Sequence, residues 1–218
     1  MEYQNSGFSG WWKRIPIVVR NIILINALIF LFMWLSQGIN QELYYKIMVN
    51  FALFPFGSGY FRLHQLVSSM FMHGGWAHLL FNMYSLFFFG CILENVWGRK
   101  KFLLYYFVTG IGAALCHLGV MYFMGEFEPI PTVGASGAVY GVLLGYGMLF
   151  PENRITMIFP IPMTLRAKWL VIIFGAIELL FGFLSFDNTA HWAHLGGMLF
   201  GLLLILKWRG KDRMYTEY

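Results

Sequence analysis

Charged side chains are scarce in this sequence. They make up 11% of its 218 residues, whereas a soluble domain of ordinary composition carries about a quarter. Cysteine is nearly absent, and both Cys91 and Cys116 lie in apolar segments, so we expect no disulfide framework. There is no serine-rich or proline-rich linker, no low-complexity segment and no tandem repeat. We therefore expect residues 1–218 to form one domain.

The sequence contains several long hydrophobic segments. Hydrophobic residues make up 59% of the chain, and several runs approach the length of about 20 residues that crosses a bilayer. We predict six membrane-spanning segments, at residues 16–36, 72–94, 102–124, 136–150, 168–186 and 190–208. The fourth is short, which leaves room above it for water and a peptide. The expected fold is an all-α polytopic membrane protein.

Lysine and arginine indicate the orientation of these segments. If the N-terminus is cytoplasmic, the inner segments hold all of the 15 lysines and arginines except Lys46 and Arg62. This bias predicts cytoplasmic N- and C-termini in a multi-pass cell-membrane protein, and the short tails suit a bacterial inner membrane. The net charge of +5 fits this topology and contact with the lipid bilayer, so we expect no nucleic-acid partner.

The first outer loop, residues 37–71, is long and rich in apolar and aromatic residues. Such a segment would expose much hydrophobic surface if it stood free in water. We expect it to lie in the membrane interface beside the helices.

Polar residues gather near the outer ends of three predicted segments. They are His73, His78 and Asn82 in the second, Ser136 in the fourth, and His191 and His194 in the sixth. Polar groups within a membrane are costly and usually face a bundle interior or a water-filled cavity. Their placement at one depth is hard to explain by packing alone, so we expect a functional site there.

The chemistry of these residues favours a nucleophilic serine. Ser136 begins a helix just after Gly134, so its backbone N–H has no helical acceptor and can face an oxyanion. A serine needs a base, and either His191 or His194 can supply one. The acid before them, Asp187, lies about two helical turns earlier, at the membrane mouth. We therefore expect a dyad whose imidazole is oriented by something other than a carboxylate.

Three further residues fit around this dyad. His78 and Asn82 are four residues apart, so they share one face of the second helix. Both carry side-chain donors that can form an oxyanion hole together with the Ser136 amide. Tyr140 lies one turn beyond Ser136 on the same face and can stack on the imidazole.

Other interpretations remain open at this point. Gly137, Gly141 and Gly145 form a small-residue stripe that is typical of close helix packing, and Ser136 alone fits the same role. Glu178 lies in the middle of the fifth segment, and an acid within a membrane by default marks a functional site. A hydrogen bond to the second helix, or a protonated acid that faces lipid, is just as plausible, so Glu178 receives no role here.

Two other kinds of function compete with a nucleophilic serine. The histidines at 73, 78, 191 and 194 could bind zinc, but the chain has no His-Glu-x-x-His pattern. A transporter or channel is disfavoured because the polar residues do not continue toward the inner side.

In this combination and order, the motifs resemble those of the rhomboid family of intramembrane serine proteases. The resemblance covers about residues 58–208. "HGGWAHLLFNM" at 73–83 matches the family pattern His-x4-His-x3-Asn, "GASGAVYG" matches Gly-x-Ser-Gly, and "AHLGG" at 193–197 matches the last-helix histidine motif. "ENVWG" at 94–98 matches a structural Glu-x3-Gly element. In the first loop, Phe61 before Arg62 replaces the tryptophan of the family's Trp-Arg pair.

The resemblance implies the compact six-helix prokaryotic form and cleavage of transmembrane protein substrates near the outer face. It implies that Ser136 is the nucleophile, that His194 rather than His191 is the base, and that His78 and Asn82 stabilise the oxyanion. The supporting residues that it implies are Tyr140, Gly134 and His73. It implies no metal, no cofactor and no particular oligomeric state. Non-catalytic relatives that bind transmembrane clients typically lack the serine or the histidine, and this chain has both.

The fifth segment carries five aromatic residues, Trp169, Phe174, Phe181, Phe183 and Phe186. In the family this helix and the outer loops act as a gate for substrate. Packing against lipid explains the same composition equally well.

Overall fold

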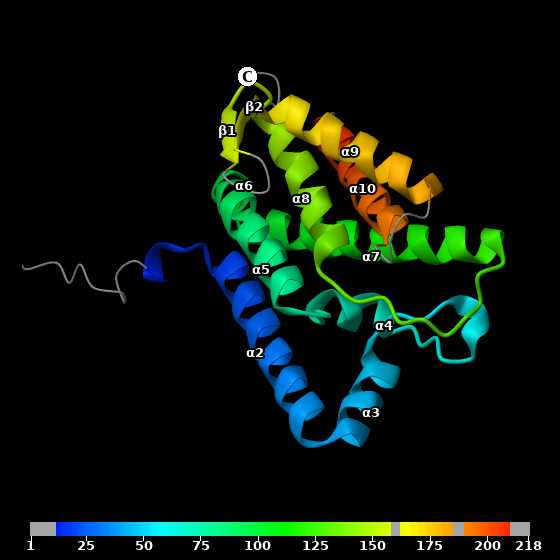
Figure 1. Ribbon diagram of the computed structural model, residues 1–218. Coiled ribbons are helices and arrows are strands. Elements are labelled where there is room, and N and C mark those ends of the chain that lie inside the picture. Colours follow the sequence, from blue (N-terminus) through cyan, green and yellow to red (C-terminus); the bar gives the residue numbers. More distant parts are fainter. Residues whose placement is uncertain (1–11, 158–161, 185–189, 210–218) are drawn as a thin grey trace, which may run out of the picture.

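Helices dominate the structure (Figure 1). The computed structural model describes residues 12–157, 162–184 and 190–209. The longer helices are α2 (Ile17–Ile39), α3 (Gln41–Phe51), α5 (Trp76–Ser85), α7 (Arg99–Met124), α8 (Ser136–Leu149), α9 (Ala167–Leu184) and α10 (His191–Arg209). The short ones are η1 (Phe56–Ser58), α4 (Gln65–Ser68), η2 (Ser69–Phe71), the π-helical η3 (Leu86–Gly90) and α6 (Cys91–Trp97). Two strands, β1 (Arg154–Met157) and β2 (Met163–Arg166), complete the fold.

Helices stand where the six membrane-spanning segments were predicted. Within the described ranges, four are long and apolar enough to cross a membrane: α2, the continuous run Trp76–Trp97, α7 and α9. Helix α8 is apolar but only 14 residues long, and α10 is 19 residues long, with Lys207 and Arg209 in its last turn. The prediction of an all-α polytopic membrane protein is confirmed.

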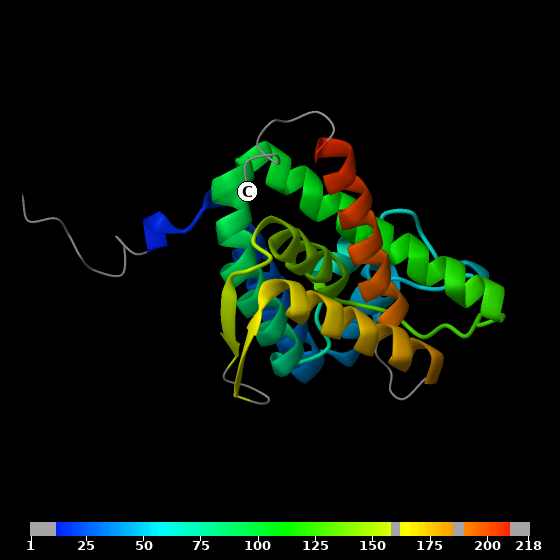
Figure 2. The same cartoon turned by 90° about the horizontal axis from the view of Figure 1, so that it is seen from above.

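Helix α8 occupies the centre of the bundle, and Figure 2 shows it enclosed by α5, α6, α7, α9 and α10. Every residue from 137 to 147 is buried except Tyr140. A helix that is apolar on all sides is stable only when it is enclosed in this way. The helix is short, and its first residue, Ser136, is half-buried among its neighbours.

The predicted small-residue stripe on α8 does pack closely. A side chain on Gly137 would overlap Ala113 of α7, and one on Gly141 would overlap Thr109. On α10, a Cβ at Gly197 would overlap the backbone carbonyl of Gly137. Small residues let helix backbones approach in this manner. The stripe therefore fixes the height of α8 against α7 and α10.

The first outer loop folds into short helices and supports the start of α8. Leu53 and Thr132 exchange backbone hydrogen bonds of 2.9 and 2.8 Å. The backbone N–H of Gly134 donates to the carbonyl of Ser69 at 3.0 Å. The side chain of Gln65 is fully buried and donates to the carbonyls of Val49 and Tyr60. The segment between Thr132 and Ser136 is thus held from the loop side.

Basic residues gather at the opposite end of the bundle. A cavity of about 400 Å³ is lined there by Lys13, Arg14, Arg20 and Arg99. The carboxylate of Glu94 accepts the free backbone N–H groups of Val18 and Val19 at 3.0 and 2.8 Å, so it caps the start of α2. This is the structural role expected for the "ENVWG" element.

A β-hairpin that the sequence did not predict connects α8 to α9. Strands β1 and β2 pair antiparallel, with Arg154 opposite Arg166. The carboxylate of Glu152 accepts hydrogen bonds from Lys168 and Arg166. The bond from Lys168, with the charges of both cations, holds the pKa of Glu152 below its usual value. These contacts attach the inner end of α9.

Candidate active site

Ser136 and His194 meet at the end of the bundle where α8 and α10 begin. Ser136 is the first residue of α8, and His194 lies in the first turn of α10. The distance between Nε2 of His194 and Oγ of Ser136 is 2.8 Å. This is the reach that a general base needs to take a proton from a nucleophile. His191, the other candidate base, points its Nδ1 at Glu178 instead.

A turn that requires glycine sets the position of Ser136. Gly134 has φ +138°, a conformation that side chains other than glycine rarely adopt. A Cβ at Gly134 would also lie 2.8 Å from Cε1 and Nε2 of the His78 ring. Position 134 therefore needs glycine both for its backbone and for the space that it leaves to His78.

Tyr140 stacks on His194 as the sequence suggested. Their ring centroids are 4.2 Å apart, and the ring planes differ by 8°. The stack fixes the plane of the imidazole from the α8 side.

Glu178 places a carboxylate beside the imidazole of His194, where the sequence led us to expect none. It is 5% exposed, and its Oε1 accepts a hydrogen bond from the hydroxyl of Tyr140. Its Oε2 lies 2.7 Å from Nδ1 of His191 and 2.8 Å from Nδ1 of His194. Glu178 neither bonds to the second helix nor faces lipid. Asp187, the acid that the sequence placed nearest to the histidines, lies outside the described residues.

The sequence does contain a signal for the position of Glu178. Gly175, Glu178 and Gly182 are spaced by three and four residues, so they share one face of α9. A Cβ at Gly175 would lie 3.2 Å from Met198, and one at Gly182 would lie 3.2 Å from Trp192, both on α10. Small residues mark a helix–helix contact, and Glu178 lies between them on the same face.

The partners of Glu178 also indicate the tautomer of His194. An ionised carboxylate accepts hydrogen bonds and donates none. Beside an ionised Glu178, a neutral His194 would carry its hydrogen on Nδ1, and its Nε2 would offer a lone pair to Ser136. Nδ1 of His194 lies 2.8 Å from Oε2 of Glu178, but the two do not form an aligned hydrogen bond. Nδ1 of His191 does form an aligned hydrogen bond to the same oxygen. Catalytic contacts commonly align only when substrate is bound.

The two candidate oxyanion residues have different neighbours. The ring of His78 adjoins Gly134. Asn82 is 5% exposed and lies one turn further along α5, where its side-chain amide donates to the carbonyl of His78 at 2.9 Å. The structure thus brings His78 to the turn, whereas the side-chain amide of Asn82 bonds within its own helix.

His73 packs against His78 rather than against Ser136. It is 2% exposed, and the two imidazole centroids are 5.0 Å apart in an edge-to-face arrangement. Within the described part of the chain, neither ring nitrogen of His73 has a hydrogen-bond partner. Its contact is therefore one of packing behind the His78 ring.

A zinc site made by four histidines does not match this arrangement. The group with metal-type spacing in the described ranges is Glu178, His191 and His194, with ligand atoms within 4.8 Å of one another. Neighbouring ligands of a tetrahedral zinc ion stand about 3.3 Å apart, given bonds of about 2.0 Å. The nitrogens here lie 2.7 and 2.8 Å from the carboxylate oxygen, which are hydrogen-bond distances.

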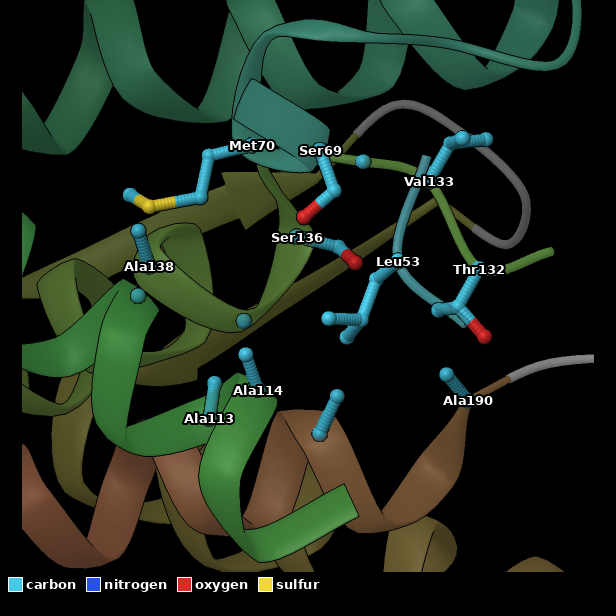
Figure 3. Close-up of a pocket in the computed structure, with 14 residues that line it drawn as sticks. Leu53, Ser69, Met70, Ala113, Ala114, Thr132, Val133, Ser136, Ala138 and Ala190 are labelled. Atoms are coloured by element: carbon cyan, nitrogen blue, oxygen red, sulfur yellow. The ribbon is translucent and has the colours of Figure 1, made fainter. Parts of the chain in front are cut away.

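A small cavity adjoins the Ser136 hydroxyl. Its volume is about 30 Å³, and Figure 3 shows the hydroxyls of Ser136 and Ser69 turned toward its middle. Leu53 and Thr132 of the supporting bridge also line it. A space of this size holds one or two water molecules.

The aromatic residues of α9 divide between two environments. Trp169 and Phe183 are 51% and 68% exposed, so both face outward from the bundle. Phe174 and Phe181 are partly buried and contact Tyr140 and His191 respectively. Phe186 lies outside the described residues.

Comparison with known proteins shows to which family the chain is similar. Residues 60–210 match the family model of the Rhomboid domain. The chain is 28% identical over 213 residues to the mitochondrial presenilin-associated rhomboid-like protein of Rattus norvegicus, which covers 93% of this chain and 53% of that protein. It is 30% identical over 213 residues to RHOMBOID-like protein 12, mitochondrial, of Arabidopsis thaliana, covering 89% and 60% of the two chains.

A bacterial protein is also similar. The rhomboid protease GluP of Bacillus subtilis is 32% identical over 137 residues, which cover 63% of this chain and 24% of that protein. The chain thus spans about half the length of the mitochondrial relatives that it matches. With a family model that matches more than half of its residues, this chain belongs to the rhomboid family.

Proposed function

We propose that the protein is a serine endopeptidase that cleaves transmembrane segments of other membrane proteins within the bilayer. The observation that carries the proposal is the 2.8 Å contact between Ser136 and His194, made between the first turns of α8 and α10. Membership of the rhomboid family supports the same reaction class.

In the proposed reaction, Oγ of Ser136 attacks a backbone carbonyl of the substrate while Nε2 of His194 accepts the hydroxyl proton. The resulting imidazolium then protonates the leaving amine, and water hydrolyses the acyl-enzyme. The cavity beside Ser136 offers space for such a water molecule.

The oxyanion would be stabilised by three donors. The Ser136 amide belongs to the first turn of α8, where N–H groups have no helical acceptor. His78 adjoins Gly134, two residues before the nucleophile. Asn82 would complete the set by turning its amide from the His78 carbonyl toward the substrate. Each such donor typically contributes a factor of about 10²–10³ to kcat.

The substrate would be a transmembrane helix that unwinds near the outer face. An intact helix satisfies its own backbone groups and keeps its peptide bonds from attack. Substrates with helix-weakening residues near the scissile bond should therefore be cleaved fastest. Entry of the substrate beside α9 stays a prediction.

The orientation of the protein follows from its charges. The cluster of basic residues near Lys13 and Arg99 would face the cytoplasm or the equivalent organelle compartment. The named relatives are mitochondrial or bacterial, so the comparisons do not favour the bacterial inner membrane that the short tails suggested.

The test is cleavage of a reporter transmembrane substrate in proteoliposomes. Wild type should cleave it, Ser136→Ala and His194→Ala should not, and a chelator should have no effect. Ser36→Ala is the matched control and should cleave as wild type does, because it removes a buried hydroxyl that lies on α2 and donates to the carbonyl of Met33. Cleavage that survives Ser136→Ala, or that stops on chelation, would refute the proposal.

A further inference from the structure

The carboxylate of Glu178 joins three helices at the proposed active site. Glu178 belongs to α9, and its contacts come from Tyr140 on α8 and from His191 and His194 on α10. All of these residues except Tyr140 are buried, and Tyr140 is half-buried. A buried carboxylate with this many donors is held in one place rather than solvated.

We propose that Glu178 is a positioning residue for His194, so that the site works as a Ser136–His194–Glu178 triad. This rests on the proposed function and deepens it. Glu178 touches neither Ser136 nor the substrate. It acts through the imidazole, by keeping the hydrogen on Nδ1 and by facing the imidazolium that forms when Nε2 takes the Ser136 proton.

The geometry assigns different tasks to the two histidines. His191 makes an aligned hydrogen bond to Oε2, and Tyr140 donates to Oε1, so these two hold the carboxylate. The second contact of Oε2, at 2.8 Å, is with Nδ1 of His194. His194 is the member of the group whose other nitrogen faces the nucleophile. The holding contacts are thus separate from the one that serves catalysis.

A purely structural role for Glu178 makes a different prediction. In that case its function is to join α9 to α8 and α10, and the proximity of His194 has no consequence for the reaction. Losses of activity in Glu178 and His191 variants would then follow losses of stability. The two roles are separated by measuring kcat, KM and thermal stability together.

The first experiment compares Glu178→Gln, Glu178→Asp and His191→Gln in proteoliposomes with a reporter transmembrane substrate. We expect Glu178→Gln to lower kcat by about 10²–10⁴-fold, the range of a general base that is lost or misoriented, with KM little changed. Glu178→Asp should restore part of this loss. His191→Gln should lower thermal stability as much as Glu178→Gln does, with a much smaller loss of kcat.

The control for removal of a charge is Glu152→Gln. Glu152 is an exposed carboxylate with two cationic partners at the inner end of α9. Its loss should leave kcat unchanged. The proposal is overturned if Glu178→Gln keeps the wild-type kcat, or if kcat falls in parallel with stability in the Glu178 and His191 variants alike.

The pH profile gives an independent readout. The titratable groups that face His194 are Tyr140, Glu178 and His191, and His78 and His117 lie within electrostatic range. Loss of the carboxylate makes the imidazolium less favourable, so the acid limb of the kcat profile should move to lower pH in Glu178→Gln. An unchanged acid limb would contradict the proposed contact.

Two further measurements keep the proposal separate from the proposed function. A fluorophosphonate reports activation of Ser136 without any peptide substrate. If wild type is labelled in a Glu178-dependent way but cleaves no transmembrane reporter, the substrate proposal fails and the triad stands. If wild type is not labelled at all, both fail.

If Glu178→Gln does not fold, ¹⁵N chemical shifts of the His194 imidazole in the wild-type protein decide the question. A hydrogen on Nε2 of His194 would overturn the triad.

Discussion

The ring of Tyr140 lies parallel to the ring of His194, with 4.2 Å between their centroids. The same tyrosine donates its hydroxyl to Glu178, whose other oxygen contacts the imidazole. One side chain of α8 therefore restrains the proposed base in two ways, through the plane of its ring and through the carboxylate behind it.

These two restraints can be separated by substitution. Tyr140→Phe keeps the stack but removes the donor to Glu178, and a hydrogen bond to a charged group contributes about 1.5–3 kcal/mol. We expect kcat to fall by about tenfold or somewhat more. Tyr140→Leu removes both restraints, so its kcat should fall further. The measurement is kcat with the reporter substrate, alongside thermal stability.

Tyr105→Phe is the matched control for the lost hydroxyl. Tyr105 is fully buried on α7 and donates to the carbonyl of Gly141. Its substitution should lower stability by about 1 kcal/mol and leave kcat unchanged. If Tyr140→Phe and Tyr105→Phe had the same effect on kcat, Tyr140 would have no special part in the site.

Asn82 provides a second prediction. Asn82→Ala should lower kcat by about 10²–10³-fold if its amide serves the oxyanion, and the fold should persist. Asn26→Ala is a close control, because Asn26 is also buried and also donates to the carbonyl four residues earlier, at 2.8 Å, but on α2. It should affect stability alone. Equal turnover in both variants would remove Asn82 from the oxyanion hole.

Gly134 should tolerate no side chain. Gly134→Ala strains a backbone at φ +138° and presses on the His78 ring, so both stability and kcat should fall. Gly125→Ala separates the two effects. Gly125 also has a positive φ, +75°, but a Cβ there meets open space at the end of α7. Gly125→Ala should cost about 1–2 kcal/mol of stability. The protein that stays folded should keep the wild-type kcat.

The contact between α8 and α10 is the subject of a fourth prediction. A Cβ at Gly197 would overlap the carbonyl of Gly137, so Gly197→Ala must move the two helices apart. Ser136 and His194 lie on these helices, and a misplacement of about 1 Å can cost about 10²-fold in rate. We expect kcat to fall by about that factor.

The control for Gly197→Ala is Gly119→Ala, within α7. A Cβ at Gly119 meets nothing within 4 Å. Alanine favours the helix over glycine by about 0.5–1 kcal/mol, so thermal stability should stay the same or rise slightly. Wild-type kcat in Gly197→Ala would show that the separation of α8 and α10 is less strictly set than the structure indicates.

Much of the fold could be predicted because the membrane restricts the choices. Long apolar runs mark helices, and the asymmetry of basic residues orients them. Once the orientation is known, residues as far apart in sequence as Ser136 and His194 are assigned to one depth. Their 2.8 Å contact agrees with that assignment.

The position of Glu178 could not be predicted in the same way. Depth follows from sequence, but the rotation of a helix about its axis follows from an uneven distribution of polar residues. Helix α9 is apolar on most sides, so this signal is weak. Gly175 and Gly182, on either side of Glu178, indicate which face of α9 packs against the bundle. Their contacts with α10 explain why Glu178 faces the histidines.

The β-hairpin was missed for a different reason. Strands β1 and β2 have four residues each and lie between two helices. A run of that length is too short for alternation to stand out. Its cross-strand contact between Thr156 and Thr164 is visible only in the structure.

The most direct test of the central claim is the site of covalent modification by a fluorophosphonate in the membrane-embedded protein. Peptide mapping by mass spectrometry should find one adduct, on Ser136, which is lost in Ser136→Ala and forms far more slowly in His194→Gln. An adduct on Ser69, whose hydroxyl faces the same cavity, or no adduct at all, would contradict the assignment of Ser136 as the nucleophile.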